Sequence, residues 1–161
     1  MKKRDILAAA QSGTGKTAAF VLPILTELLE TKQANKPILR ALILVPTREL
    51  ANQIALEIRK LSRHIHNLKV LTLCGGTPFK PQVLSLSHGA HIIVATPGRV
   101  LKHIEQNNID LENINTLVLD EADKMLDMGF YDDIMFIINQ LPAKRQNLLF
   151  SATMPSKIRE L

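Results

Sequence analysis

Short apolar runs alternate along the chain with longer segments in which apolar residues recur at helical spacing. Each run is long enough for one buried strand, and the runs cover residues 6–9, 39–45, 70–73, 91–95, 116–119 and 147–150. Helical spacing follows five of these runs, at residues 18–22, 48–63, 78–87, 100–104 and 134–141. Strands that alternate with helices predict an α/β fold, in which a mostly parallel sheet carries helices on both faces.

A polar cluster follows every predicted strand. In chain order the clusters are residues 13–17, 46–49, 75–76, 96–99, 120–123 and 151–153. Sheets of this kind bind ligands in the crevice at the carboxyl ends of their strands. The pattern therefore predicts that these clusters meet along one edge of the sheet and form the functional site.

The first cluster has the arrangement of a phosphate-binding loop, because it lies between a strand and a helix and reads Ala10-Gln11-Ser12-Gly13-Thr14-Gly15-Lys16-Thr17. The two glycines allow a turn in which a Cβ would clash, so that backbone N–H groups and the helix dipole bind phosphate. Lys16 adds charge for the outer phosphates, and the Thr17 hydroxyl is a ligand for Mg²⁺. Ala10 stands where the general pattern has Gly, which leaves an ordinary turn as the alternative.

Asp120 and Glu121 end the fifth predicted strand. At this position Asp120 would hold Mg²⁺, partly through water. Glu121 would point elsewhere, since successive side chains on an extended chain diverge, and would orient or deprotonate the attacking water. The alternative is that both acidic residues only cap the next helix.

Two further clusters read as helix starts. Thr47 and Thr96 are predicted N-caps, and Pro97 strengthens the second case. Free N–H groups at the two helix starts, with Arg48 and Arg99 beside them, would bind phosphates. A single nucleotide cannot fill all these separated anion sites, whereas a nucleic-acid backbone can run across two of them. Capping alone is the alternative.

The Gly75-Gly76 pair would let a nucleic-acid backbone approach closely, although a plain turn is equally compatible with it. No aromatic residue is interleaved with these clusters, so recognition should be independent of sequence.

Ser151 and Thr153, after the last strand, are predicted to hydrogen-bond Asp123 and to link the nucleotide side to the nucleic-acid side; the alternative is that they are only turn residues before a helix that begins near Pro155. Four apolar residues after the fifth strand lie near helical spacing and are expected in the core: Met125, Leu126, Met128 and Phe130.

Composition narrows the class of protein. The 161 residues suit one domain, and 46% apolar with 4% aromatic residues predicts an aliphatic core. The net charge of +5 permits a polyanionic partner, and no apolar run has the length of a membrane span. Cys74 is the only cysteine, which excludes an intramolecular disulfide and favours a reducing, cytoplasmic location. The histidines are scattered without metal-ligand spacing.

Taken together, the clusters resemble the motifs of the DEAD-box ATP-dependent RNA helicases. Asp120-Glu121-Ala122-Asp123 is the sequence that names this family, and residues 10–17 resemble its motif I, in which the first residue is usually Ala. Residues 46–51 are similar to motif Ia, residues 75–76 to the GG motif, residues 96–99 to motif Ib and residues 151–153 to motif III. The likeness covers nearly the whole chain in the family's order.

The resemblance implies a RecA-like P-loop domain, a three-layer sandwich that binds ATP and Mg²⁺ and contacts the RNA backbone. Lys16, Asp120 and Glu121 would then serve catalysis, with metal binding by Thr17 and Asp120. The residues along the RNA would be Thr47, Arg48, Gly75, Gly76, Thr96, Gly98 and Arg99.

The family's Q motif, which reads adenine, lies upstream of motif I and is absent, as is the second RecA-like domain. Residues 1–161 are therefore expected to be a partial first domain, truncated at both ends, with little or no activity alone.

Two other readings stay open. A DNA helicase motor of a related superfamily would share the nucleotide site, although Asp123 favours the RNA class. A non-hydrolysing RNA clamp or scaffold would share the RNA contacts, although intact Lys16, Asp120 and Glu121 count against it.

Overall fold

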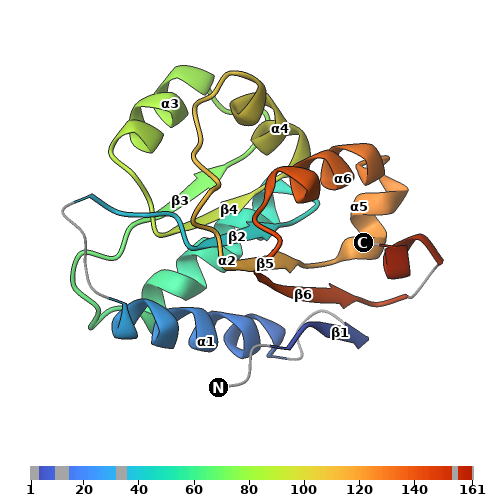
Figure 1. Cartoon of the computed structure of the whole chain (residues 1–161), viewed down its shortest axis with the longest axis horizontal. Helices are drawn as coiled ribbons and strands as arrows, with labels where there is room; N and C mark the ends of the chain where they lie inside the picture. Colours follow the sequence, from blue (N-terminus) through green and yellow to red (C-terminus); the bar gives the residue numbers. More distant parts are fainter. Residues whose placement is uncertain (1–3, 10–14, 32–35, 154–155, 161) are drawn as a thin grey trace.

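The computed structural model describes residues 4–9, 15–31, 36–153 and 156–160. Within these residues six strands form one sheet in the order β1-β6-β5-β2-β4-β3 (Figure 1). The strands are β1 (Ile6–Ala9), β2 (Ala41–Leu44), β3 (Val70–Leu73), β4 (Ile92–Ala95), β5 (Thr116–Leu119) and β6 (Gln146–Ser151). All neighbouring strands pair in parallel. The predicted parallel α/β sheet is confirmed, and each expected strand lies within two residues of its predicted bounds.

The connections between the strands are mostly helical. The described helices are α1 (Lys16–Glu30), α2 (Arg48–Leu61), α3 (Phe79–Ser87), α4 (Pro97–Glu105), α5 (Ala122–Asp127), α6 (Tyr131–Gln140) and the 3₁₀ helix η1 (Ser156–Glu160). The short helix α5 was not predicted. It ends before Gly129, whose φ of +82° favours glycine and separates α5 from α6.

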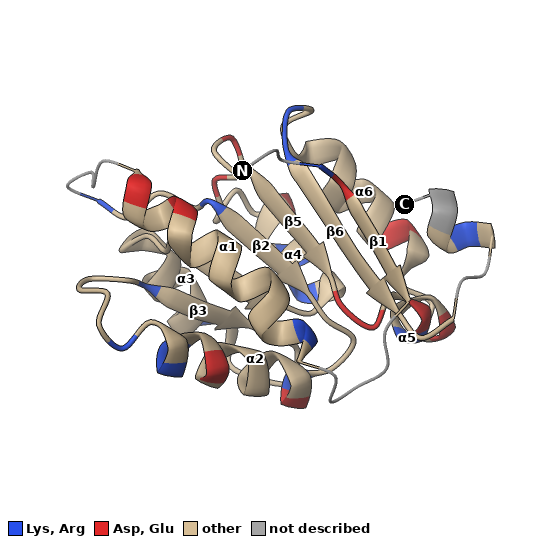
Figure 2. Cartoon of the chain, turned by 90° about the horizontal axis from the view of Figure 1, so that it is seen from below, with Lys and Arg blue, Asp and Glu red and all other residues tan. Residues whose placement is uncertain are grey.

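The sheet is buried on both faces, which makes three layers. Along β2, Ala41 and Ile43 pack toward α1 and α2, whereas Leu42 and Leu44 pack toward the opposite helices α4, α5 and α6. Figure 2 shows α1 and α2 side by side on one face of the sheet. Successive strand residues point to opposite faces, so a fully covered sheet requires the continuous apolar runs that the sequence shows.

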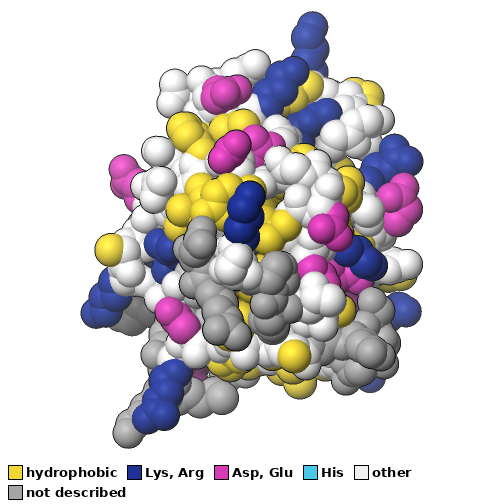
Figure 3. All heavy atoms as spheres, turned by 90° about the vertical axis from the view of Figure 1, so that its right-hand side faces the viewer, with side chains coloured by type: hydrophobic (Ala, Val, Ile, Leu, Met, Phe, Trp, Pro, Cys, Tyr) yellow, Lys and Arg dark blue, Asp and Glu magenta, His cyan; other side chains and the backbone are white. Residues whose placement is uncertain are grey.

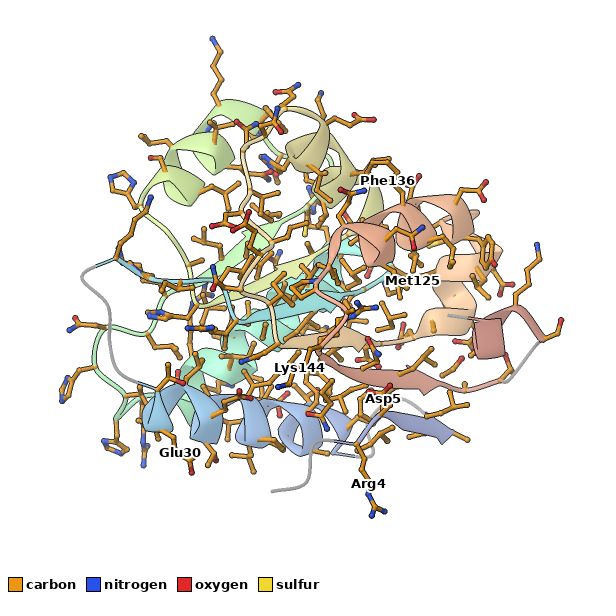
Figure 4. All side chains as sticks on the ribbon, viewed as in Figure 1. Arg4, Asp5, Glu30, Met125, Phe136 and Lys144 are labelled. Atoms are coloured by element: carbon orange, nitrogen blue, oxygen red, sulfur yellow. The ribbon has the colours of Figure 1, made fainter. Side chains whose placement is uncertain are left out.

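The core is aliphatic, as the composition predicts, apart from a tilted contact between Phe20 and Phe150 with ring centroids 5.5 Å apart. Met125 on α5 is fully buried, whereas Phe136 on α6 points outward (Figure 4). The expectation that Met128 is a core residue was wrong, because it follows the last turn of α5 and is exposed.

Strand β1 lies at one edge of the described sheet, and Ile6 and Leu7 are 47% and 52% exposed. Figure 3 shows the side of the molecule at the right of Figure 1, where hydrophobic side chains reach the surface at several places among charged and polar ones. The Asp5 carboxylate accepts the backbone N–H of Asn147 at 2.7 Å and its side-chain amide at 3.2 Å. Asp5 thus extends the attachment of β1 to β6 beyond the strand itself.

None of the helices in the described part of the chain has the length and apolar character that a bilayer crossing requires.

Substitution of Ile43 tests the packing of the central strand. The side chain is fully buried against α1 and α2, so Ile43→Ala should lower the free energy of unfolding by about 2–5 kcal/mol and Ile43→Val by about 0.5–1.5 kcal/mol. Urea unfolding of the chain measures both values. Leu84→Ala is the control, because Leu84 is 64% exposed and its loss should change stability by less than about 0.5 kcal/mol. Equal effects at the two positions would contradict the assigned core.

Candidate functional site

The start of α1 carries the Gly-Lys-Thr end of the predicted phosphate-binding loop. Gly15 precedes the helix with a φ of +80°, and α1 begins at Lys16, so Lys16 and Thr17 occupy its first turn. Residues 10–14, which hold the remainder of the predicted loop, lie outside the described residues. The part that is described has the strand-to-helix geometry that an anion site at a helix start requires.

Lys16 and Asp120 form an ion pair between segments that are far apart in the sequence. The Lys16 Nζ lies 3.1 Å from the Asp120 Oδ1, and the two side chains are only 9% and 4% exposed. The same Oδ1 accepts the backbone N–H of Glu121 at 3.0 Å. The two buried charges are tolerated because each neutralises the other. A polyphosphate with its cation would offer Lys16 a new anionic partner and Asp120 a new cationic partner.

Glu121 does not continue the extended strand, so the predicted reason for its separate direction was wrong. Its φ of 55° and ψ of 49° place it in the left-handed region, and it occupies the N-cap position of α5. A non-glycine residue in this conformation is uncommon and carries local strain. Its carboxylate accepts Lys124 Nζ at 2.9 Å, which raises the pKa of Lys124.

Asp123 forms hydrogen bonds with both of its predicted partners, Ser151 and Thr153. The Thr153 N–H and hydroxyl each donate to Asp123 Oδ2 at 3.0 Å, and the Asp123 N–H donates to the Ser151 hydroxyl at 3.1 Å. Burial would raise the pKa of Asp123, but the hydrogen bonds from Thr153, with others from Lys124 and Ser151, outweigh it and hold the pKa below 3.8. The predicted hydrogen bonds to Asp123 are confirmed, and they join the segments that follow β5 and β6.

The ends of β2 and β3 meet through Arg48 and Gly76. Thr47 is the N-cap of α2, and its hydroxyl accepts the Leu50 N–H at 3.2 Å, as predicted. Arg48 is exposed, and its guanidinium lies where a Cβ on Gly76 would be 3.6 Å from Nη1. Gly76 has a φ of +72°, so the turn itself also favours glycine here. A cation and a turn that leaves the backbone open thus lie side by side at this edge.

Thr96 occupies the predicted N-cap of α4, but its side chain does not cap the helix. Its hydroxyl instead accepts the Gly75 N–H at 3.4 Å and joins the two loops. Pro97 follows at the first helical position, as predicted. Gly98 lies in the same first turn, where an added Cβ would approach Asp133 at 3.4 Å.

Arg99 is already committed within the protein. Its Nη1 donates to the Thr77 carbonyl and to the Gln82 carboxamide, each at 3.0 Å, and the guanidinium carbon lies 5.5 Å from the centre of the Phe79 ring. Arg99 therefore braces the turn after β3 as well as bringing charge to the start of α4. Neither Gln82 nor His103 was predicted to contact this site, although His103 lies four residues after Arg99 and hence on the same helix face.

Acidic residues are absent from one long segment of the chain. Residues 58–104 contain no Asp or Glu, and their Lys and Arg residues are Arg59, Lys60, Arg63, Lys69, Lys80, Arg99 and Lys102. This segment supplies β3, β4 and the helices that follow them. The loops after these two strands therefore lie in a cationic part of the molecule, which favours a polyanion.

Cys74 is buried, with a free thiol, and burial raises its pKa. It packs with the cluster that faces α1 and α2, as expected of a small core residue.

A parallel three-layer sheet with Gly-Lys-Thr at the start of α1 and an aspartate beside it at the end of β5 defines a RecA-like P-loop domain. Comparison with known proteins gives the family. The whole chain, residues 1–161, matches the DEAD/DEAH box helicase family, and the protein belongs to it. The resemblance of the sequence motifs to those of the DEAD-box helicases is thus confirmed as family membership.

Its relatives include the ATP-dependent RNA helicase DbpA of Escherichia coli, 53% identical over 96% of this chain and 33% of the relative. The ATP-dependent RNA helicase CshA of Listeria monocytogenes is 48% identical over the whole chain and 30% of the relative. The chain thus spans about a third of the curated relatives it matches.

Solved structures show the same fold. The yeast DEAD-box splicing factor Prp28 superposes with a TM-score of 0.93 at 38% identity, over 99% of this chain and 39% of that one. A DEAD box protein from the hyperthermophile Methanococcus jannaschii gives a TM-score of 0.87 at 44% identity, over 98% and 41% of the two chains.

Removal of one donor tests the Asp123 cluster. Thr153→Val deletes the hydroxyl but keeps the side-chain shape, so the pKa of Asp123 should rise toward 3.8, as measured by carboxyl NMR titration. Because the folded-state pKa is lowered, the stabilisation by ionised Asp123 is fully present above the unfolded-state pKa and is lost as the pH falls through the folded-state pKa.

Thr153→Val should accordingly lower stability at neutral pH by no more than about 1 kcal/mol, since the cluster is partly exposed. Thr153→Ser keeps the hydroxyl and should leave the pKa nearly unchanged. An unaltered pKa in the valine variant would show that the hydroxyl contributes nothing.

Proposed function

We propose that the chain is the ATP-binding and RNA-backbone-binding domain of an ATP-dependent RNA helicase that couples ATP hydrolysis to RNA duplex unwinding or RNP remodelling. The observation that carries the proposal is the division of one sheet edge into two sites. Lys16 and Asp120 meet in the half built on β1, β6 and β5, and Arg48 and Gly76 meet in the half built on β2, β4 and β3. The names of the curated relatives support this function.

In the nucleotide half, residues 10–17 would bind the phosphates of ATP, with Lys16 on the outer ones. Asp120 and Thr17 would hold Mg²⁺, and their hard oxygen donors suit that ion. The cation supplies positive charge against the phosphates. Glu121 would orient the attacking water and accept its proton, after giving up its present contact with Lys124.

In the other half, the RNA backbone would contact Thr47, Arg48, Gly75, Gly76, Thr96, Gly98 and Arg99. The starts of α2 and α4 carry the positive ends of the helix dipoles, which are suited to phosphates, and the segment 58–104 adds a cationic field without carboxylates. Such contacts position RNA without reading its sequence.

Asp123, Ser151 and Thr153 would serve coupling: their hydrogen bonds tie the segment after β5 to the segment after β6 within the nucleotide half, and β5 pairs with β2 at the boundary to the other half. The domain would work with a second RecA-like domain of the same protein, as the greater length of the relatives suggests. We place the protein in the cytoplasm, where the free thiol of Cys74 would stay reduced.

Glu121→Gln tests hydrolysis in the full-length helicase. The amide cannot accept a proton, so RNA-stimulated ATP turnover should fall by about 100-fold or more, while ATP binding is retained. A steady-state phosphate-release assay and a fluorescent-nucleotide titration measure the two quantities. Glu112→Gln, which alters an exposed carboxylate elsewhere, is the matched control. Full turnover in Glu121→Gln would contradict the assigned role.

Arg48→Ala tests the RNA half. Loss of one exposed cation should weaken the binding of unrelated RNA sequences equally and should reduce the slope of log Kd against log salt concentration by about 0.7–1. Fluorescence anisotropy at several salt concentrations measures this slope. Lys144→Ala removes the same charge from the loop before β6, at the opposite ends of the strands, and should keep the wild-type slope (Figure 4). Equal slopes for both variants would remove Arg48 from the RNA path.

A further inference from the structure

The side-chain carboxamide of Gln82 lies at the junction of α3, α4 and the turn after β3. The residue is 9% exposed. Its Nε2 donates to the Cys74 carbonyl at 3.2 Å and to the Thr77 hydroxyl at 2.7 Å. Its Oε1 accepts Arg99 Nη1 at 3.0 Å and bonds His103 Nε2 at 2.9 Å. A primary amide has two N–H groups and two acceptor sites, and all four are used here.

These partners fix the orientation of the amide. A guanidinium can only donate and a backbone carbonyl can only accept, so the oxygen must face Arg99 and the nitrogen must face Cys74. His103 Nε2 must then carry a hydrogen and donate to Oε1. The Nδ1 atom is buried without a hydrogen-bond partner among the described residues.

His103 suits this arrangement because it stays neutral. Burial, with the nearby charges of Arg99 and Lys102, lowers its pKa to about 4. Phe79 stacks on the imidazole with the ring centres 4.3 Å apart and the planes 14° apart. Gln82 is thus clamped between a fixed neutral donor and a fixed cation.

We infer that Gln82 is a positioning residue for RNA, which holds the Gly75-Gly76 turn and Arg99 in one fixed arrangement before RNA arrives. This inference rests on the proposed function of these groups as RNA contacts. The turn is bound at Cys74 and Thr77, on either side of the glycine pair, and Arg99 is bound to the same amide and to Thr77 itself. RNA therefore meets a preorganised surface, and its binding need not supply the ordering of that turn.

An apolar side chain could fill the same volume but could not do this. It would leave an Arg99 N–H and the His103 N–H without their shared partner, and the Cys74 carbonyl would keep only the Thr77 hydroxyl, which donates to it at 2.8 Å. Unpaired buried groups of this kind destabilise a local arrangement and favour others in which they find partners. The expected result is a mobile turn above an intact sheet.

The test uses RNA-stimulated ATP turnover of the full-length helicase with Gln82→Met and Gln82→Glu. Methionine keeps the length of the side chain and removes all four hydrogen bonds. The RNA concentration for half-maximal stimulation should rise about tenfold in Gln82→Met, while turnover at saturating RNA stays near the wild-type value. Gln140→Met and Gln140→Glu, at an exposed glutamine on α6, are matched controls that should behave as wild type.

Gln82→Glu gives a readout that packing alone does not move. Glutamate keeps the oxygen that accepts from Arg99 and His103, but its second oxygen, in place of Nε2, would face the Cys74 carbonyl. Its negative charge would favour the imidazolium form of His103. ¹⁵N NMR of His103 should show a neutral ring with hydrogen on Nε2 in the wild type at mildly acidic pH, and a doubly protonated ring in the variant. The residues whose charges face this ring are Arg99 and Lys102.

The outcomes separate the two levels of the proposal. A wild-type protein without RNA stimulation overturns the proposed function and this inference with it. RNA stimulation with unchanged half-saturation in Gln82→Met, or with a loss of maximal turnover alone, overturns only the role of Gln82. If Gln82→Met does not fold, Gln82→Glu decides, because its half-saturating RNA concentration should also rise and its His103 spectrum should change. Wild-type values of both would overturn the inference.

Discussion

Parallel pairing of the strands is the constraint on which the remaining structure depends. Because each strand runs in the same direction as its neighbours, every loop that leaves a carboxyl end starts from the same edge of the sheet. Lys16 and Asp120 are 104 residues apart in the sequence, yet this geometry brings their side chains within 3.1 Å. The apolar runs that stabilise the sheet contain no polar site residues, but the sheet that they form positions the loops in which those residues lie.

The order of the strands in the sheet separates the loops into two groups, which correspond to the two proposed sites. The first, fifth and sixth strands lie together and carry the proposed nucleotide residues, whereas the second, third and fourth lie together and carry the proposed RNA residues. The division does not follow the sequence, since the chain leaves the nucleotide half after α1 and returns to it only at β5. β5 and β2 are neighbours at the boundary, and the Asp120 N–H donates to the Leu44 carbonyl at 3.0 Å across it. A change at Asp120 is therefore one ladder bond away from the segment that leads to Thr47 and Arg48.

Sequence patterns predicted the strands well because burial on both faces demands uninterrupted apolar runs, and such runs are easy to see. They also predicted the hydrogen bonds of Asp123, because the segments that follow neighbouring parallel strands leave the sheet at the same edge. The backbone of Glu121 could not be predicted, because a left-handed residue between a strand and a short helix leaves no periodicity.

Gln82 and His103 were missed for a different reason. Each is a single polar residue on its own helix, and the two form a hydrogen bond only because α3 and α4 meet in the folded protein. The side-chain role of Thr96 changed similarly, because a neighbouring loop competed for its hydroxyl.

The position of β1 has a mechanical consequence. In the described residues β1 pairs with β6 alone, and the chain runs from β1 toward Gly15 and the start of α1. A central strand would have to release two ladders to shift, whereas β1 has one, supplemented by the Asp5 contacts with Asn147. β6 in turn carries Ser151 at its end, bonded to Asp123. Strain applied at the proposed phosphate site would thus pass from β1 into the sheet through a single seam, in addition to the direct Lys16–Asp120 ion pair.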